Sequence, residues 1–254
     1  MCCFSGPVED VSLTKIFARW HSLENGLLRQ SVVYQMHYRT KNDLAMVLPL
    51  PVAPGSGEKA VAFLDLEKHA DLFEKLPLCF PELRYARDSK SVPLPDAAPP
   101  VAKLEVVQVG SYEASFVPSV KDFARLDERF RMPAGTWEQL PRYAEWGFAV
   151  FKLKATATTV HPMAFTFPHA KETRGLFFPT VHIHDGKVHQ KADFDHTLYA
   201  QPSDLRATGL MDWEESPGLA GGVLAKDYAG LVDLKSHVHR RKMNGMLTND
   251  DVWA

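Results

Sequence analysis

The sequence predicts an α+β fold, a mostly antiparallel β-sheet with a few short helices inserted between the strands. Two observations support this. β-prone runs recur along the chain between turn residues, and apolar residues take helical spacing only over short stretches. The 254 residues are 45% hydrophobic and 24% charged, as in a globular protein with a packed core. We expect a single domain over residues 1–254, or two β-rich lobes with a boundary near residues 90–102, where prolines cluster.

The predicted strands are runs rich in apolar, β-branched and aromatic residues, bounded by turn residues. They cover residues 13–20, 27–38, 44–51, 60–66, 104–117, 148–156 and 161–167. The first three strands are expected to form a β-meander. The meander should end at Pro49, Pro51 and Pro54, because proline has no N–H group to donate to a ladder.

Short helices are predicted at three places. Residues 67–76 carry apolar residues at helical spacing. Two further stretches begin with a pattern like a capping box, at Ser119 to Asp122 and at Thr136 to Gln139, and each continues with apolar residues at helical spacing. These helices therefore interrupt the run of strands.

The charge balance argues against several kinds of partner. Formal net charge is −2 and the isoelectric point is near 6.6, so no basic field would attract nucleic acid or an anionic membrane. No run approaches the ~18 apolar residues of a membrane span, and Glu9 and Asp10 stand where a signal peptide would be apolar. We expect a cytoplasmic protein. A small-molecule substrate and any oligomeric state stay open.

The segment 180–189 carries the main functional prediction. Asp185-Gly186 between two β-prone runs is a strong signal for a two-residue hairpin turn. In such a hairpin His182 and His184 share one face of a strand, and His189 lies opposite His182 on the partner strand. Three imidazoles would then meet on one face of the ribbon.

Three imidazoles on one face predict a metal site. Neutral imidazole is a common ligand for zinc and copper, and three of them leave a coordination position for water or substrate. We therefore expect a cofactor of one transition metal, zinc or copper, and a metal-dependent enzyme if a substrate reaches the open position. A solvated sheet face would show the same alternation, so this second interpretation stays open.

Carboxylates and further histidines follow the segment. Asp193 and Asp195 would share the face of His189 on a regular strand, where they would orient the imidazoles or act as a base on bound water. His196 would face away unless a bulge intervenes. His237 and His239 could complete the site, bind an anion, or belong to an exposed charged segment.

Two other functions remain possible on the sequence alone. If Met1 is removed, Cys2 carries a free amine beside its thiol, which is the arrangement of an N-terminal nucleophile hydrolase or a glutamine amidotransferase. The adjacent thiols of Cys2 and Cys3 could equally be soft metal ligands. The third interpretation is a non-enzymatic binding module whose strands present a groove to a peptide or partner protein.

Short apolar patterns occur in a fixed order along the chain. They are Cys3, Pro7-Val8, Ile16-Phe17-Ala18 and residues 34–38 and 46–52 near the start, then residues 109–114, 151–154 and 161–163. Together they resemble a DUF2330-like family, which consists of mostly exported bacterial proteins of unknown function, over about residues 3–200. The resemblance implies a topology and a cysteine near the N-terminus, and it implies no chemistry. The sequence differs from that family in its lack of an export signal and in the histidine segment.

Overall fold

The computed structural model describes most of the chain. The described residues are 3–24, 27–52, 55–81, 107–109, 112–169, 175–202 and 210–254. Cys2 and the predicted boundary near 90–102 lie outside them. Within the described ranges, no helix has both the length and the apolar character needed to cross a membrane.

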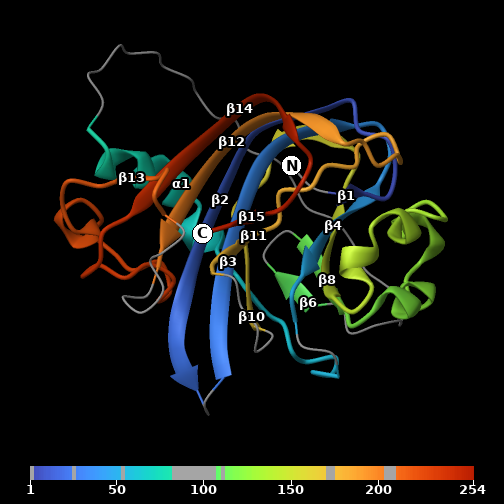
Figure 1. The fold of residues 1–254 in the computed structure, drawn as a ribbon, viewed down its shortest axis with the longest axis horizontal. Coiled ribbons are helices and arrows are strands. Elements are labelled where there is room, and N and C mark those ends of the chain that lie inside the picture. The colour runs from blue at the N-terminus through green and yellow to red at the C-terminus, as the bar shows by residue number, and fades with distance from the viewer. Residues whose placement is uncertain are drawn as a thin grey trace.

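An eight-stranded sheet forms the centre of the molecule (Figure 1). Its strands are, in spatial order, β13 (Glu214–Glu215), β14 (His239–Thr248), β12 (Lys191–Gln201), β2 (Asp10–Glu24), β3 (Leu27–Thr40), β10 (Met163–Pro168) and β5 (Ala62–Leu64), with β9 (Thr156–Thr159) paired to the end of β3. All neighbouring strands are antiparallel except β12 and β2, which are parallel.

Two smaller sheets complete the β structure. The first has five strands in the order β1 (Cys3–Phe4), β4 (Leu44–Leu50), β8 (Gly147–Leu153), β7 (Tyr112–Val117) and β6 (Val107–Val109), and the second pairs β11 (Phe177–Phe178) with β15 (Val252–Trp253). The predicted, mostly antiparallel β architecture is therefore confirmed.

The predicted β-meander is wrong after its first hairpin. β2 and β3 pair as expected, but β4 leaves β3 and pairs with β8 and β1 in the other sheet. Every residue of β4 is buried, so this strand needs cover on both faces, which the end of a meander would not provide. Pro49 does not end the ladder between β4 and β8, where it lies opposite Phe148. On the other edge of β4, β1 pairs only with Met46 and Val47, so the missing N–H of Pro49 interrupts no ladder there.

The helices are shorter and tighter than predicted. Among the described residues they are η1 (Glu67–His69), α1 (Leu72–Lys75), η2 (Leu76–Cys79), η3 (Val120–Arg125), η4 (Glu128–Phe130), η5 (Trp137–Gln139), η6 (Pro141–Tyr143) and η8 (Ala220–Gly222), and of these only α1 is an α-helix. The expected capping box does not form, since Ser119 Oγ donates to Asp122 Oδ2 over 2.8 Å and caps no backbone N–H. Leu126 is extended, with ψ of 157°, and this divides the predicted helix into single turns.

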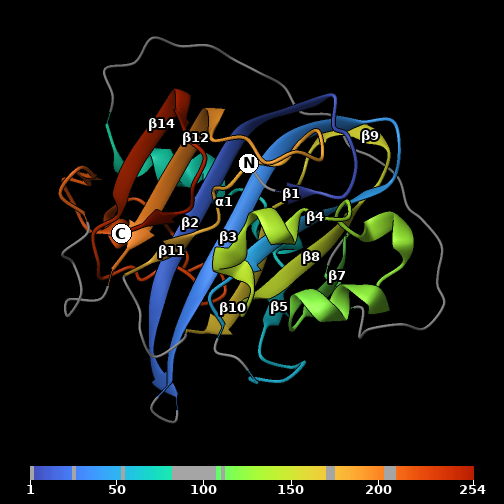
Figure 2. The same cartoon turned by 45° about the vertical axis from the view of Figure 1, so that its right-hand side comes forward.

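The main core lies between the two larger sheets. Phe151 of β8 contacts Phe63 of β5 and Phe165 of β10, with ring centroids 5.5 and 6.0 Å apart. A second cluster covers the other face of the large sheet, where α1 and η2 pack on Phe17 and Tyr199. The third covers the other face of the five-stranded sheet with the turns η3 to η6, which Figure 2 shows lying against β4 and β8.

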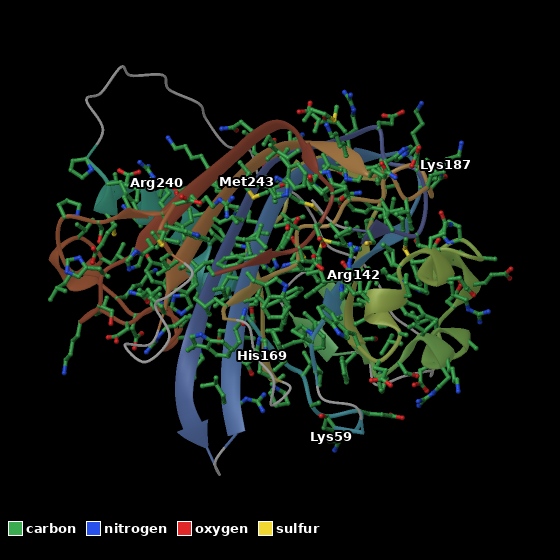
Figure 3. All side chains as sticks on the ribbon, in the orientation of Figure 1. Lys59, Arg142, His169, Lys187, Arg240 and Met243 are labelled. Atoms are coloured by element: carbon green, nitrogen blue, oxygen red, sulfur yellow. The ribbon has the colours of Figure 1, made fainter. Side chains whose placement is uncertain are left out.

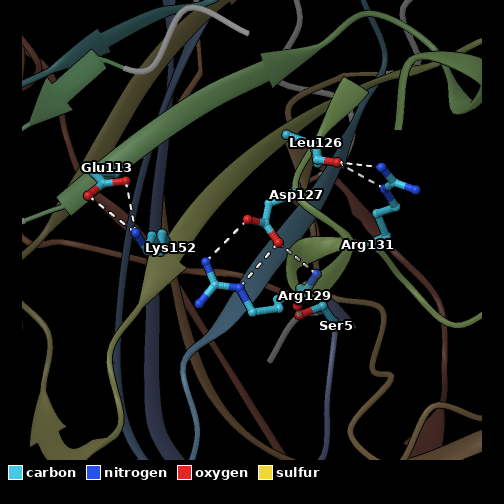
Figure 4. A network of polar contacts seen from close by, with 7 residues as sticks. All are labelled: Ser5, Glu113, Leu126, Asp127, Arg129, Arg131 and Lys152. Atoms are coloured by element: carbon cyan, nitrogen blue, oxygen red, sulfur yellow. Dashed lines mark hydrogen bonds and ion pairs between the residues drawn. The ribbon is translucent and has the colours of Figure 1, made fainter. Parts of the chain in front are cut away.

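Polar contacts anchor these turns to the five-stranded sheet (Figure 4). Ser5 Oγ accepts a hydrogen bond from Ala45 N–H over 2.9 Å and donates to the carbonyl of Arg129 over 3.0 Å. Arg129 in turn holds the Asp127 carboxylate, at 3.2 Å from its Nε and its Nη2. Arg131 donates to the carbonyl of Leu126 at the extended break between the turns. Side chains therefore satisfy the carbonyl groups of Leu126 and Arg129, which lie in this irregular segment.

Replacing Phe151 by alanine should test whether both sheets share this core. The substitution Phe151→Ala would leave a cavity between the sheets, so the free energy of unfolding should fall by about 3–5 kcal/mol. Denaturant unfolding measures the change. Leu78→Ala is the matched control, because Leu78 is 47% exposed and should change stability by less than about 0.5 kcal/mol. Equal effects of the two substitutions would contradict the packing.

Candidate functional site

The predicted histidine hairpin does not form. In residues 180–189 the only ladder contact is an isolated bridge, in which Ile183 lies parallel to Cys3 of β1. Asp185-Gly186 does turn the chain, because Gly186 has φ of +78° and Asp185 Oδ1 accepts the N–H of Lys187 over 3.0 Å. The residues on either side of this turn do not pair as a ladder. We call the segment 180–189 the histidine loop.

The C-terminal segment takes the place of the missing partner strand. Asp251 Oδ1 accepts the N–H groups of Thr180 and Val181, over 3.0 and 3.2 Å. Asn249 Oδ1 accepts the N–H of His182 over 2.7 Å, and Asn249 Nδ2 donates to the carbonyls of His182 and His189, each over 2.9 Å. These side chains satisfy the backbone groups that a hairpin ladder would use, so no ladder is needed.

Two of the three predicted ligands lie together and the third does not. The rings of His182 and His184 stack with centroids 5.3 Å apart and planes at 12°. His189 lies at the exposed end of the loop, where its Nε2 is 2.9 Å from Asp185 Oδ2. The ribbon that would have turned His189 toward His182 is absent, and for this reason the predicted set is not assembled.

His196 joins the pair from β12. Its Nε2 lies 3.4 Å from Nε2 of His182, and Phe194, two residues earlier, packs on the His182 ring at 4.1 Å. The sequence had indicated that His196 would face away. Its alternation with Phe194 and Leu198, both buried, is the signal that would have placed it on the inner face.

The two aspartates have different positions. Asp195 Oδ1 lies 3.6 Å from Nδ1 of His196, and its Oδ2 accepts the N–H of Leu13 over 2.5 Å. Asp193 is exposed and stands opposite Met246 of β14. Of the two carboxylates, only that of Asp195 therefore lies beside a histidine ring, at a distance beyond that of a hydrogen bond.

Burial sets the protonation of the imidazoles. His182 and His196 are 5% and 1% exposed. Burial holds the pKa of His182 far below its ordinary value and lowers the pKa of His184 to about 4. His184 also has its Nε2 buried without a hydrogen-bond partner, beside the ring of Phe4 at 5.5 Å. At neutral pH His182 and His184 are therefore neutral, which is the form that binds metals.

The three histidines His182, His184 and His196 lie together, and we call them the imidazole cluster. Two imidazole nitrogens bound to one tetrahedral zinc, each at 2.0–2.1 Å, stand about 3.3 Å apart. The Nε2 atoms of His182 and His196 are 3.4 Å apart. In the described ranges no three His, Cys, Asp or Glu side chains stand ready to hold a metal ion. The spacing of the Nε2 atoms of His182 and His196 is therefore compatible with two ligands of one metal ion.

The remaining candidates are engaged elsewhere or lie outside the description. His237 Nδ1 donates to the carbonyl of Ser216 over 2.7 Å and lies 3.7 Å from Glu215 Oε1. Cys3 is fully buried in β1. Cys2 lies outside the described residues, so the hydrolase interpretation stays a prediction.

Comparisons with known proteins give a likeness of shape only. No protein-family model and no curated protein matches the sequence. A crystal structure of baculovirus P35 superposes with a TM-score of 0.48 at 13% identity, covering 99% of this chain and 98% of that chain. A mutated baculovirus P35 after caspase cleavage gives a TM-score of 0.44 at 13% identity, covering 97% and 98%. These scores support no functional argument, and the resemblance to the family of unknown function stays a prediction.

The contact between Asp251 and the histidine loop should make stability depend on pH. Burial raises the pKa of Asp251 to about 6, although Tyr143 Oη and two backbone N–H groups donate to its carboxylate. A carboxyl group whose pKa is raised by folding contributes fully to stability at pH values below its ordinary pKa of 3.8. This contribution is lost as the pH rises through the pKa of the folded state, about 6. The Asp251→Asn variant has no carboxyl group at this position and therefore does not titrate there. Wild type should therefore lose on the order of 2–3 kcal/mol relative to this variant between pH 4 and pH 7.

Denaturant unfolding at several pH values measures this difference. Asp212→Asn, at an exposed turn, is the control and should keep the wild-type profile. A difference between wild type and Asp251→Asn that stays constant from pH 4 to pH 7 would show that the carboxyl does not titrate in this window.

Proposed function

We propose that this protein binds one transition metal ion, zinc or copper, through His182, His184 and His196. The observation that carries the proposal is the 3.4 Å separation of the Nε2 atoms of His182 and His196 inside a buried, apolar setting. Imidazole is a good ligand for both metals. The proposal keeps the predicted cofactor and replaces His189 by His196.

Without a metal ion the two rings share one long hydrogen bond, since its 3.4 Å exceeds the roughly 2.7–3.2 Å of ordinary N–H···O bonds. Two imidazole nitrogens at this distance have the spacing of two ligands of one tetrahedral cation. His184 supports the proposal because its Nε2 has no hydrogen bond to give up when the ring turns.

The third ligand would leave one coordination position open. A water molecule held there would have its pKa lowered toward ~7 and would become a nucleophile for a small-molecule substrate. Asp195 Oδ1, now 3.6 Å from Nδ1 of His196, would have to move within hydrogen-bond distance to orient the ring, the usual arrangement behind a metal-bound histidine. Enzymatic activity would therefore require a bound metal ion and, in addition, a path by which a substrate reaches the open coordination position.

Metal analysis tests the proposal. Protein purified without a histidine tag and dialysed against zinc or copper should retain about one metal ion per chain by elemental analysis. The double substitution His182→Gln/His196→Gln should abolish this binding, while His189→Gln, at an exposed residue, should leave it unchanged. Circular dichroism shows whether the double variant still folds.

Cobalt provides a second measurement that does not depend on that variant. Wild-type protein titrated with Co²⁺ should show the visible bands of a tetrahedral site with one equivalent bound. Metal-free wild type under these conditions, or full occupancy in the folded double variant, would rule out this site.

The position of Asp195 gives a sharper prediction with a control on the same strand. Asp195→Asn keeps an acceptor for Leu13 N–H but weakens the hold on His196, so metal affinity should fall about 10–100-fold. Asp193→Asn, two residues away and exposed, should leave the affinity unchanged. Competition with a chromophoric chelator measures both. Equal affinities would remove Asp195 from the site.

A further inference from the structure

One buried side chain holds both arms of the histidine loop. Asn249 is 7% exposed, and its Oδ1 accepts the N–H of His182 over 2.7 Å. Its Nδ2 donates to the carbonyls of His182 and His189, each over 2.9 Å, and its backbone N–H donates to the carbonyl of Gln190 over 3.0 Å. The two arms meet near the exposed turn at Lys187, which Figure 3 labels. Asn249 therefore sets the distance between the arm before the turn and the arm after it.

The same contacts constrain the spacing of two imidazoles. Gln190 continues directly into β12, which carries His196, whereas His182 lies on the other arm of the loop. The Nε2 atoms of His182 and His196 are 3.4 Å apart, and the ring of Phe194 packs on His182 at 4.1 Å. Asn249 fixes His182 at both its N–H and its carbonyl, relative to the start of β12. This side chain therefore also constrains the spacing of the two rings.

Asn249 begins a segment, residues 249–254, that runs from the end of β14 to β15 (Figure 1). Side chains connect this segment to the histidine loop. Asp251 Oδ1 accepts two N–H groups of the loop, and Thr180 Oγ1 donates to the carbonyl of Asp250 over 2.7 Å. The ladder of β15 with β11 is only two residues long. A ladder of this length is marginal by itself, so the side-chain contacts decide whether the segment stays docked on the loop.

We propose that a metal ion in the imidazole cluster and the docked segment 249–254 stabilise each other, with Asn249 as the positioning residue between them. The inference rests on the proposed metal site. A docked segment holds His182 at the spacing that two ligands of one ion need, and an ion that joins His182 to His196 holds both arms where Asn249 binds them. Such coupling is reciprocal, so docking raises the metal affinity by the same factor by which the metal favours docking. Displacement of the segment would therefore lower the metal affinity of the site.

The substitution Asn249→Ala tests the positioning role through metal affinity. The variant loses three side-chain hydrogen bonds to His182 and His189, so competition with a chromophoric chelator should show zinc bound about tenfold more weakly, or weaker still. Thr248→Ala is the neighbouring control, because Thr248 is exposed, and it should bind zinc as wild type does. Leu72→Ala is the control for stability alone. Leu72 is buried on the other face of the large sheet, so this variant should unfold more easily and keep the wild-type affinity.

Hydrogen exchange measures the reverse effect in the unmodified protein. The amide of Ala254 donates to the carbonyl of Leu176 over 2.9 Å, at the end of the segment opposite to Asn249, and the amide of Thr180 donates to Asp251. Both amides are protected only while the segment is docked, so one equivalent of zinc should slow their exchange about tenfold. The amide of Leu76, which donates within α1 on the other face of the large sheet, should exchange at an unchanged rate.

The outcomes separate this coupling from the metal site itself. Wild-type protein that takes up no zinc would remove both. Zinc binding by wild type, together with an equal affinity in the folded Asn249→Ala variant, would overturn the coupling and leave the metal site standing. If that variant does not fold, exchange in wild type decides the question. An Ala254 amide whose exchange zinc leaves unchanged would then overturn the coupling, whereas slower exchange would support it.

Discussion

The hydrogen bonds from Asn249 and Asp251 to the backbone of the histidine loop are the constraint on which this region depends. They reach across 67 to 71 positions in the chain and satisfy the N–H groups of three consecutive residues from Thr180 to His182. With those groups satisfied, the loop is free of any ladder on that side and bridges instead to β1 through Ile183. The same C-terminal segment continues into β15, which pairs with β11. The segment from Asn249 to Trp253 thus both binds the backbone of the histidine loop and pairs with β11.

The constraint explains why imidazoles gather in a buried place. His182 is brought against β12, where the alternation of side chains already turns Phe194 and His196 inward. Desolvation keeps the imidazoles of His182 and His184 neutral, since a buried charge without a partner costs several kcal/mol. Neutral, closely spaced nitrogens are what a transition metal requires. The packing that suppresses protonation therefore favours the proposed ligand.

Most strands were predictable from the sequence because the signal for a strand is local. Runs such as Val32 to Tyr34 and Phe165 to Phe167 are β-prone whatever surrounds them, and the Asp185-Gly186 turn is also real. Only the tertiary structure decided that β4 joins the second sheet, that the turn opens no hairpin, and that His196 rather than His189 lies beside His182. Each of these outcomes depends on a partner far away in the chain, such as Asn249 for His182. Local sequence patterns do not encode that pairing, because it is set by which distant groups satisfy the buried backbone.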